Sequence, residues 1–560
     1  MLSYKEFMNE VKKQLNAFSE EELQKAILTW ASEVPPTKRE EFLDRLQPKQ
    51  DIEDSLYDEE SLIHEIEGFG VRVENGDFFD GYGWDYEIHD ERAYGDESWM
   101  EEVAEFLLEI REMMLRGNTE AAEEAYRKLF DIVDMGMESD YLPGDVDLAD
   151  MLEVDVNEQV TLFLRAVYVN ASPGERVNAF YEAMENYRYF ARSQLKLIDI
   201  RDVLDTELPD FDIFLKESID FLKDFRTFYS GDLLREAVFL KGGIPALSIF
   251  AKEHADTYPA AYLDWIQKLE NGGHPDGEIV KVAKEGLSNI PVDFIVRAQI
   301  AATLVKIGEK LQNDDLKLEG HKECFLSKPT MEHLVDLYAI AIKHGCLDAV
   351  QNEAVKRLKQ LQKTGDTGRN ILPERNTSGF SDRVYANALL LAGQHEKIFE
   401  LCKGKGPVGW SSYDNPKFIF VAFMLVLLSK KRIDSSVLEQ QLIEATAGID
   451  YDSDNSYVKQ YRKVMDHILP LSELSAEQEE FYLNWCKEQT GKRVDAIVSN
   501  QYRGSYHKAA RLLVAVAETM ANRGNRQEGL SFIEKYKKKY PRHVAFKREI
   551  TEAFNHSSLS

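Results

Sequence analysis

The sequence has few of the features that mark a secreted or membrane-spanning protein. It contains four cysteines in 560 residues, and their spacing fits neither a disulfide framework nor a set of zinc-binding pairs. Such cysteine usage is typical of a reducing compartment. The longest apolar run, FIFVAFMLVLL at residues 418–428, is too short for a bilayer-spanning helix, which needs about 20 residues. We expect a soluble, cytoplasmic protein in which residues 418–428 form a helix buried on all sides.

Motifs for catalysis, targeting and metal binding are also missing. The start of the chain, residues 1–6, leads into an amphipathic pattern without the apolar core of a signal peptide. The stretch GKGPVGW at residues 404–410 lacks the spacing and the Ser or Thr of a phosphate-binding loop. No GxGxxG follows a predicted strand, and GxSxG and HExxH do not occur. His321/Cys324 and His344/Cys346 have zinc-binding side chains, but not at the spacing of a zinc knuckle. The sequence therefore predicts no enzyme, no metal and no cofactor.

Basic residues are outnumbered by acidic ones. The chain has 68 Lys and Arg against 99 Asp and Glu, a net charge of −31. A field of this sign argues against a protein that coats nucleic acid or an anionic membrane along its whole length. With 44% hydrophobic residues the chain can still bury a core. Its length predicts three or four compact units or one extended array.

The acidity is concentrated near the N-terminus. Residues 51–100 hold 17 Asp or Glu against Arg72 and Arg92, a net charge of −15. Within this segment, residues 68–99 are rich in glycine and aromatics, and we expect something other than helix here. Asn75-Gly76, between apolar pairs, predicts the turn of a β-hairpin.

Three interpretations of this acidic segment remain open. Its carboxylates are hard-cation ligands, although they do not form the loop of an EF-hand; they are Asp77, Asp80, Asp85, Glu87, Asp90 and Glu91. The segment is also suited to docking a basic partner or to mimicking nucleic acid. The third interpretation is a solvated loop whose aromatics pack on the first repeat. For a docking surface, the candidate contact residues are Phe78, Phe79, Trp84 and Asp85.

From Glu101 onward the pattern is helical and repeats in pairs. A helix, a glycine near its end and a second helix recur, with the glycine expected as a left-handed cap; these glycines are Gly117, Gly308, Gly345, Gly393 and Gly524. Several second helices end at a proline, and Pro259, Pro291 and Pro329 follow one another at intervals of 32 and 38 residues. This period is typical of two-helix repeats of the tetratricopeptide and HEAT type. We predict an all-α fold, an irregular α-solenoid with a small, acidic, partly β insertion near the N-terminus.

The chain divides by composition into four segments. Residues 1–50 predict N-terminal helices, the second of them capped by Ser19 with Glu22 three residues on, and a third short one through Phe42. Residues 51–99 are the acidic segment. Residues 100–369 and 370–560 are two helical-repeat arrays, divided by a polar run at 365–382.

The C-terminal end is basic. Residues 481–560 hold 15 Lys or Arg and 7 Asp or Glu, a net charge of +8. Lys537, Lys538, Lys539 and Arg542 lie among aromatics, a combination that suits a nucleic-acid backbone. The alternative is a solvated face on a terminal helix pair. Ends of opposite charge also allow self-association, head to tail.

The C-terminal third resembles a known family. The stretch VDAIVSNQYRGSYHKAARLL at residues 494–513 and the ending YPRHVAFKREI are similar to the C-terminal helical region of prokaryotic SWIM zinc-finger proteins, and the unit at 298–329 is similar to their repeat. The resemblance covers roughly residues 94–550. The family's zinc module uses CxC and CxH ligand pairs, and this chain has no CxC. The resemblance therefore implies a helical scaffold without zinc ligands.

Together these features favour a non-catalytic helical-repeat scaffold or adaptor that binds a protein partner. A solenoid presents an extended surface, so its function usually lies in binding. The alternative is a nucleic-acid-associated accessory protein that acts through the basic C-terminal helices. The identity of the partner does not follow from the sequence.

Overall fold

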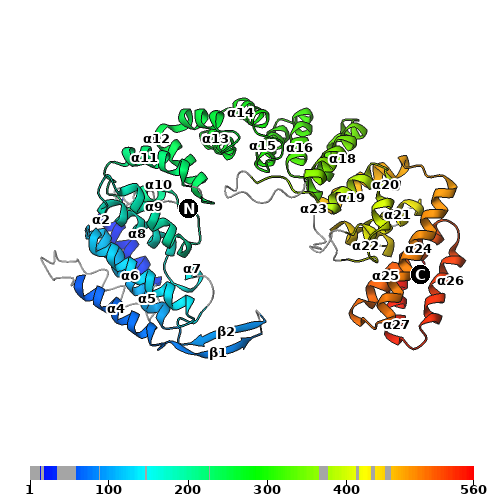
Figure 1. Cartoon of the computed structure of the whole chain (residues 1–560), viewed down its shortest axis with the longest axis horizontal. Coiled ribbons are helices and arrows are strands. Elements are labelled where there is room, and N and C mark those ends of the chain that lie inside the picture. The colour runs from blue at the N-terminus through cyan, green and yellow to red at the C-terminus, as the bar shows by residue number, and fades with distance from the viewer. Residues whose placement is uncertain are drawn as a thin grey trace. The chain divides into compact units, whose positions relative to one another are not determined.

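The computed structural model describes residues 13, 18–33, 59–86, 89–144, 148–225, 227–364, 376–410, 415–430, 436–447 and 456–560. Helices make up most of these residues, and one two-stranded hairpin interrupts them near the N-terminus (Figure 1). The chain forms two compact units, Met1–Ala246 and Leu247–Ser560. The predicted all-α class with a partly β insertion is confirmed.

Unit 1 is built from helices that follow one another closely in the chain. In order they are α2 (Glu20–Glu33), α4 (Glu59–Glu74), α5 (Trp99–Arg116), α6 (Thr119–Glu138), α7 (Leu148–Met151), α8 (Val156–Asn170), α9 (Arg176–Tyr187), α10 (Leu197–Asp202), α11 (Phe211–Asp224) and the start of α12 (Ser230–Glu253). Aromatic rings join α6, α8 and α9: Phe163 lies 5.6 Å from Phe130 and 5.1 Å from Tyr187, measured between ring centroids. The contacts of α4 with α6, of α5 with α6 and of α8 with α9 join helices that are one or two places apart in the chain, which is the packing of a helical-repeat solenoid.

Unit 2 continues with the rest of α12 and with further helices. They are α13 (Ala260–Asn271), α14 (Asp276–Asn289), α15 (Val296–Lys310), α16 (Asp314–Ser327), α17 (Met331–Lys343), α18 (Leu347–Thr364), α19 (Asp382–Leu391), α20 (His395–Lys403), α21 (Lys417–Ser429), α22 (Val437–Ala447), α23 (Ser456–Ile468), α24 (Ala476–Ser499), α25 (Tyr506–Asn522), α26 (Arg526–Lys539) and α27 (Val544–Asn555). As expected, Pro259, Pro291, Pro329 and Pro541 all lie between helices, because proline cannot continue a helix that precedes it.

Packing in unit 2 changes character toward its end. From α13 to α16 the main contacts join consecutive helices, whereas α17 also packs against the distant α23, and α21 packs against α22, α24 and α25 together. Every residue of α21 from Lys417 to Ser429 is buried, so the predicted buried helix over residues 418–428 is confirmed. The apolar run is therefore long because α21 has neighbours on all sides. This part of the array is a bundle in which α25 packs against α21, α22, α24, α26 and α27.

Glycines punctuate the helix pairs as expected at four of five positions. Gly117, Gly345, Gly393 and Gly524 all have positive φ, between 65° and 94°, a conformation that glycine adopts without a Cβ clash. The expectation for Gly308 is wrong. This residue lies inside α15, and a Cβ there would approach the backbone nitrogen of Lys317 to 3.0 Å. Gly308 is needed for the close approach of α15 and α16, while the left-handed residue of that turn is Gln312.

Two local predictions near the N-terminus have different outcomes. The cap of α2 is confirmed: the backbone amide of Ser19 donates to the carboxylate of Glu22, and the amide of Glu22 donates to the hydroxyl of Ser19. The prediction of a hairpin turn at Asn75-Gly76 is wrong, because these residues end α4. Gly76 has φ 73°, and its amide and that of Asp77 donate to the carbonyls of Val73 and Arg72, which is a Schellman motif.

Several predictions fall outside the described residues. They concern the short helix through Phe42, the side chain of Glu87 and most of the polar run at 365–382. The described end of that run, residues 376–378, pairs with residues 293–295 through backbone hydrogen bonds, including 2.7 Å from the amide of Ser378 to the carbonyl of Asp293. The division of the chain into four segments stays a prediction.

Candidate docking surface

The hairpin of unit 1 is formed by β1 (Phe79–Asp85) and β2 (Asp90–Gly95), which pair antiparallel. It extends from the helices at the junction of α4 and α5 (Figure 1). Gly95 closes its base, because the amide of Asp96 donates to the carbonyl of Phe78 and any Cβ on Gly95 would collide with that carbonyl. The residues before β1 and after β2 therefore lie side by side where the hairpin joins the helices.

Both flanks of the hairpin are anchored by buried aromatics. Before β1, Phe78 is buried, with its ring 5.7 Å from that of Phe69 and with the guanidinium of Arg72 above it. After β2, Trp99 is fully buried and its indole N–H donates to the carbonyl of Pro143. Of the four predicted contact residues, Phe78 therefore belongs to the core and is closed to a partner.

One face of the hairpin is closed by its own side chains. The ring of Tyr94 covers Gly83, where a Cβ would lie 2.8 Å from it, and the guanidinium of Arg92 lies 4.9 Å from that ring. Arg92 also forms ion pairs with Asp85 at 3.3 Å and with Glu97 at 3.9 Å. Asp85, another predicted contact residue, is thus half-buried and occupied by Arg92. An aromatic ring over a strand glycine replaces the packing that the glycine lacks.

The other face presents aromatic rings to solvent. The exposed fraction is 62% for Tyr82, 50% for Trp84 and 81% for Tyr86. Phe79 is half-buried and lies 5.1 Å from Tyr82 and 6.3 Å from Tyr141 of the turn after α6. Trp84 and Phe79 therefore stay candidate contacts. Tyr82 and Tyr86 were missed by the sequence analysis, although the alternation of glycine and aromatic residues in FDGYGWDY was the available signal.

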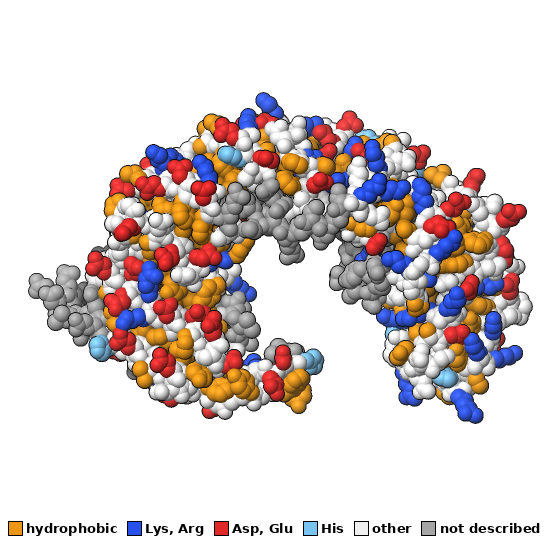
Figure 2. All heavy atoms as spheres, viewed as in Figure 1, with side chains coloured by type: hydrophobic (Ala, Val, Ile, Leu, Met, Phe, Trp, Pro, Cys, Tyr) orange, Lys and Arg blue, Asp and Glu red, His pale blue; other side chains and the backbone are white. Residues whose placement is uncertain are grey.

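Acidic groups surround these rings. Residues 79–86 and 89–97 contain Asp80, Asp85, Asp90, Glu91, Asp96 and Glu97 against Arg92 alone, so the described hairpin carries 1 − 6 = −5. Figure 2 shows hydrophobic side chains at the hairpin with carboxylates beside them. The hydroxyl of Tyr82 donates to the carboxylate of Asp140, and this hydrogen bond raises the pKa of Tyr82. Tyr82 therefore stays neutral and remains tied to the end of α6.

The basic C-terminal residues are placed differently from one another. Lys537 pairs with Glu534 of its own helix, and Lys539 pairs with Asp495 of α24 at 2.7 Å. Lys538 and Arg542 are exposed. The aromatics between them, Tyr536, Tyr540 and Phe546, are buried. The basic positions thus lie on the outer face of a helix pair, and acidic neighbours already neutralise two of the four candidates.

The candidate metal ligands do not come together. Among the residues that the structure describes, no group of three or more His, Cys, Asp or Glu side chains is arranged to hold a metal ion. Cys324 is buried, its thiol lies 3.4 Å from the carbonyl of Ala298, and burial raises its pKa to about 12. Over the same described ranges, no helix has the length and apolar character that crossing a membrane requires.

Comparison with known proteins does not assign the chain to a family. No family model matches the chain, and no curated protein matches it. One similar solved structure is described as a circular tandem repeat protein with novel repeat topology and enhanced subunit contact surfaces. The match has 12% sequence identity and a TM-score of 0.17, and it covers 89% of this chain and 98% of that one. At this TM-score the two backbones do not superpose as wholes, and the fold class here follows from the chain's own helices.

Proposed function

We propose that the protein is a non-catalytic helical-repeat scaffold, and that its hairpin binds a Lys- and Arg-rich segment of a protein partner. The observation that carries the proposal is the solvent-exposed row of Tyr82, Trp84 and Tyr86 within a hairpin of net charge −5. Exposed aromatics on a rigid support are typical of binding hot spots. At least half of the surface of each of these three side chains is in contact with solvent and would become buried only against a partner.

The negative charge of the hairpin favours a positively charged partner segment. Opposite charge speeds encounter and excludes acidic competitors, and aromatic faces attract guanidinium and ammonium groups. Arg92 gives an example within the chain: its guanidinium lies over Tyr94 and pairs with Asp85 and Glu97. An arginine of a partner would find the same combination at Trp84 or Tyr86, with Asp80, Asp90 and Glu91 as its carboxylates.

Other features support the remaining parts of the proposal. All four cysteines are free thiols, and three of them are buried, which suits a cytoplasmic protein. The absence of an enzyme motif in the sequence supports a scaffold, and the resemblance to the helical region of SWIM zinc-finger proteins stays a prediction. The nucleic-acid alternative is disfavoured because Lys537 and Lys539 already have acidic partners.

A peptide-binding experiment tests the proposal directly. The full chain is titrated by calorimetry with a peptide of Lys and Arg residues spaced by glycine, and with a matched peptide of Asp and Glu. The double variant W84A/Y86A changes only exposed side chains, and the control Y502A removes a tyrosine that is 61% exposed in unit 2. We expect the double variant to weaken binding of the basic peptide about tenfold or more, since each lost stacking contact contributes about 1 kcal/mol.

The pattern across the variants decides the outcome. Binding of the basic peptide that W84A/Y86A weakens and Y502A leaves unchanged supports the hairpin. Equal binding by W84A/Y86A and the parent chain contradicts it. If neither peptide binds, and single-stranded nucleic acid instead binds the full chain with a steep salt dependence that K538E/R542E abolishes, the C-terminal alternative replaces the proposal.

A further inference from the structure

The second strand of the hairpin, β2, has an open edge. It pairs with β1 on one side, and among the described residues no backbone hydrogen bond joins β2 to a helix or to a third strand. A strand uses only every second residue to bond one neighbour, so the remaining N–H and C=O groups of β2 face away from β1. Such a row of unpaired groups is a template on which a further strand can form.

The register of the hairpin identifies the outward groups of β2. The amide of Asp96 donates to the carbonyl of Phe78, and this hydrogen bond flanks the opposed residues Phe79 and Gly95. In an antiparallel ladder, a bond in that position leaves the flanked pair without hydrogen bonds between its own members. The backbone groups of Gly95 therefore do not bond β1.

The same alternation continues along β2, because the irregularity of the hairpin lies on β1, between Phe79 and Gly81. Ala93 and Glu91, two and four residues before Gly95, therefore also turn their backbone groups outward. The amide of Glu91 donates only to the carboxylate of the adjacent Asp90, at 2.9 Å. The amide and carbonyl of Ala93 bond no group outside the hairpin in the described structure.

The side chains beside this edge continue the exposed aromatic row. Tyr82 lies opposite Ala93, and Trp84 lies opposite Glu91, so these four side chains share one face of the hairpin. Ala93 contributes only a methyl group. A long side chain on an added strand can therefore lie over Ala93 and reach the two rings.

Charge favours the β2 edge over the β1 edge. Residues 90–97 carry one positive and four negative charges, 1 − 4 = −3, whereas β1 contributes two carboxylates. β1 is also joined to the end of α6, through the hydrogen bond from Tyr82 to Asp140 and the ring contact of Phe79 with Tyr141. A basic strand therefore has more carboxylates and fewer obstacles at β2.

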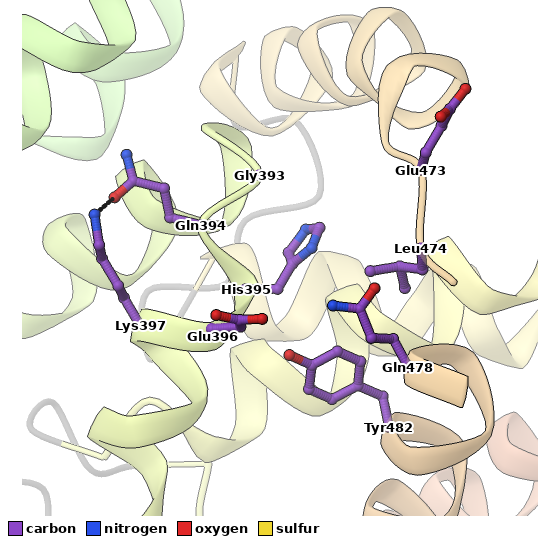
Figure 3. A pocket seen from close by; sticks show the side chains of 9 residues that line it. All are labelled: Gly393, Gln394, His395, Glu396, Lys397, Glu473, Leu474, Gln478 and Tyr482. Carbon is purple, nitrogen blue, oxygen red and sulfur yellow. Dashed lines mark hydrogen bonds between the residues drawn. The ribbon is translucent and has the colours of Figure 1, made fainter. Parts of the chain in front are cut away.

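The acidic pocket of unit 2 does not offer a basic side chain a comparable site. This pocket, of about 220 Å³, lies between α20 and the start of α24, and its lining includes His395, Glu396, Glu473 and Tyr482. Figure 3 shows the carboxylate of Glu473 pointing away from that of Glu396, so the two do not converge on one cation. The Nε2 atom of His395 is buried and has no hydrogen-bond partner.

We propose that the basic segment of the partner binds as a third strand along β2, bonded to the backbone of Ala93 and Glu91, with Lys and Arg side chains over the aromatic row. The inference rests on the proposed function, which supplies the charge of the partner, and it adds an extended conformation. Backbone hydrogen bonds then give affinity and alternate side chains give specificity. A hairpin of two strands is marginally stable alone, so the third strand also stabilises it.

Backbone N-methylation of a peptide tests strand addition without changing the protein. A peptide in which Lys and Arg alternate with alanine is titrated into the full chain by calorimetry. Two isomers of equal mass and charge are compared with it: one is N-methylated at the central basic residues, and the other at the alanines between them. Alternate amides of an extended strand face opposite sides, so only one isomer loses the amides that face β2.

We expect one isomer to bind about tenfold or more weakly than the other, because it lacks N–H donors and places methyl groups against β2. The other isomer is expected to keep most of the affinity of the parent peptide. Equal affinities of the two isomers overturn strand addition. If W84A/Y86A still weakens the parent peptide in that case, the proposed function stands without this inference, whereas a parent peptide that does not bind contradicts both.

A pair of variants at one position tests the edge from the side of the protein. A93P removes the outward amide and no hydrogen bond to β1, at an edge position where proline is tolerated. A93V keeps the amide and serves as the matched control. Both are first checked for an unchanged near-ultraviolet circular dichroism spectrum. We expect A93P to weaken binding of the parent peptide about tenfold or more and A93V to change it little; equal affinities of the two variants would contradict the assignment of this edge.

Discussion

At the scale of single residues, the two units each bury a titratable group in an unusual state. In unit 2, His395 is held neutral by burial. In unit 1, Glu236 of α12 is half-buried, and its two carboxylate oxygens accept from the amides of Leu197 and Ile198 at 2.9 and 3.0 Å. Arg165 donates to the carbonyls of Ile200 and Arg201 at the other end of α10. This short helix is therefore held at both ends by side-chain hydrogen bonds, from its first amides to a carboxyl group and from a guanidinium to its last carbonyls.

The stability of unit 2 is expected to fall as the pH falls from about 6.5 to about 4. The pKa of His395 is about 4 in the folded chain, against an ordinary value of 6.5 for a histidine exposed to water, so over this range the unfolded chain binds one proton that the folded chain does not. The loss amounts to roughly 3 kcal/mol. Urea unfolding of the parent chain and of H395Q at pH 7 and pH 4.5 measures it, and a variant with the same pH dependence as the parent would contradict the assignment.

Glu236 is expected to make the stability of unit 1 fall as the pH rises, which is the opposite of the effect of His395 on unit 2. Burial raises its pKa to about 7, against the effect of the two backbone amides that lower it. Between about pH 4.5 and 7 the folded chain keeps a proton that the unfolded chain loses, so stability falls as the pH rises, by roughly 3 kcal/mol. The variant E236Q keeps one acceptor and cannot ionise. Its unfolding free energy is expected to change less than that of the parent chain across this range, measured by urea titration with the far-ultraviolet signal.

At the scale of helices and strands, glycine has two different roles that look alike in the sequence. Some glycines end a helix with positive φ, as Gly76 and Gly393 do. Others sit inside helices where two backbones meet: α15 and α16 approach each other at Gly308 and at Gly320, whose Cβ would lie 2.9 Å from the amide nitrogen of Val305. The first role depends on local conformation, and the second on a neighbour that only the fold brings close.

This distinction predicts opposite effects for one substitution at two helical glycines. Gly308→Ala is expected to destabilise unit 2 by roughly 1–3 kcal/mol, since backbone atoms 3.0 and 3.1 Å away must move. Gly277→Ala, in α14, meets no atom within 4 Å and is expected to stabilise the protein by about 0.5–1 kcal/mol through its helix propensity. Thermal unfolding of both variants measures the difference. If both variants change the melting temperature in the same direction, α15 and α16 can move apart at little cost and the prediction for Gly308 is wrong.

At the scale of the whole chain, the two compact units are expected to unfold separately. Each has its own core, and the division at Ala246–Leu247 comes just after a break in α12, where Gly243 has a non-helical conformation and Pro245 lacks an amide hydrogen. Differential scanning calorimetry is expected to show two transitions. Raising the pH from 4.5 to 7 should move the transition of unit 1 down and that of unit 2 up, because of Glu236 and His395. H395Q should alter the pH response of one transition alone, and a single transition shifted by both H395Q and E236Q would refute this.

Much of the fold was predictable because it depends on local patterns. The helix pairs, the caps at Gly117 and Gly524, the cap at Ser19 and the buried helix over residues 418–428 are consequences of spacing, of the permissiveness of glycine and of one uninterrupted apolar run. The same local reasoning failed at Asn75-Gly76, because that dipeptide ends a helix as readily as it turns a hairpin. The flanking residues decide between the two, and here Val71 and Val73 belong to α4.

The candidate sites show the same division between sequence and structure. By itself the sequence determined that an acidic, aromatic segment interrupts a helical array, and it identified Trp84 as a candidate contact. Only the tertiary structure decided that Phe78 is an anchor in the core, that Asp85 is occupied by Arg92, and that Tyr82 and Tyr86 are exposed. It also brought His395 beside Tyr482, 87 residues further along. Composition and periodicity are properties of neighbouring residues, whereas burial and unsatisfied hydrogen bonds depend on which distant helix closes over a side chain.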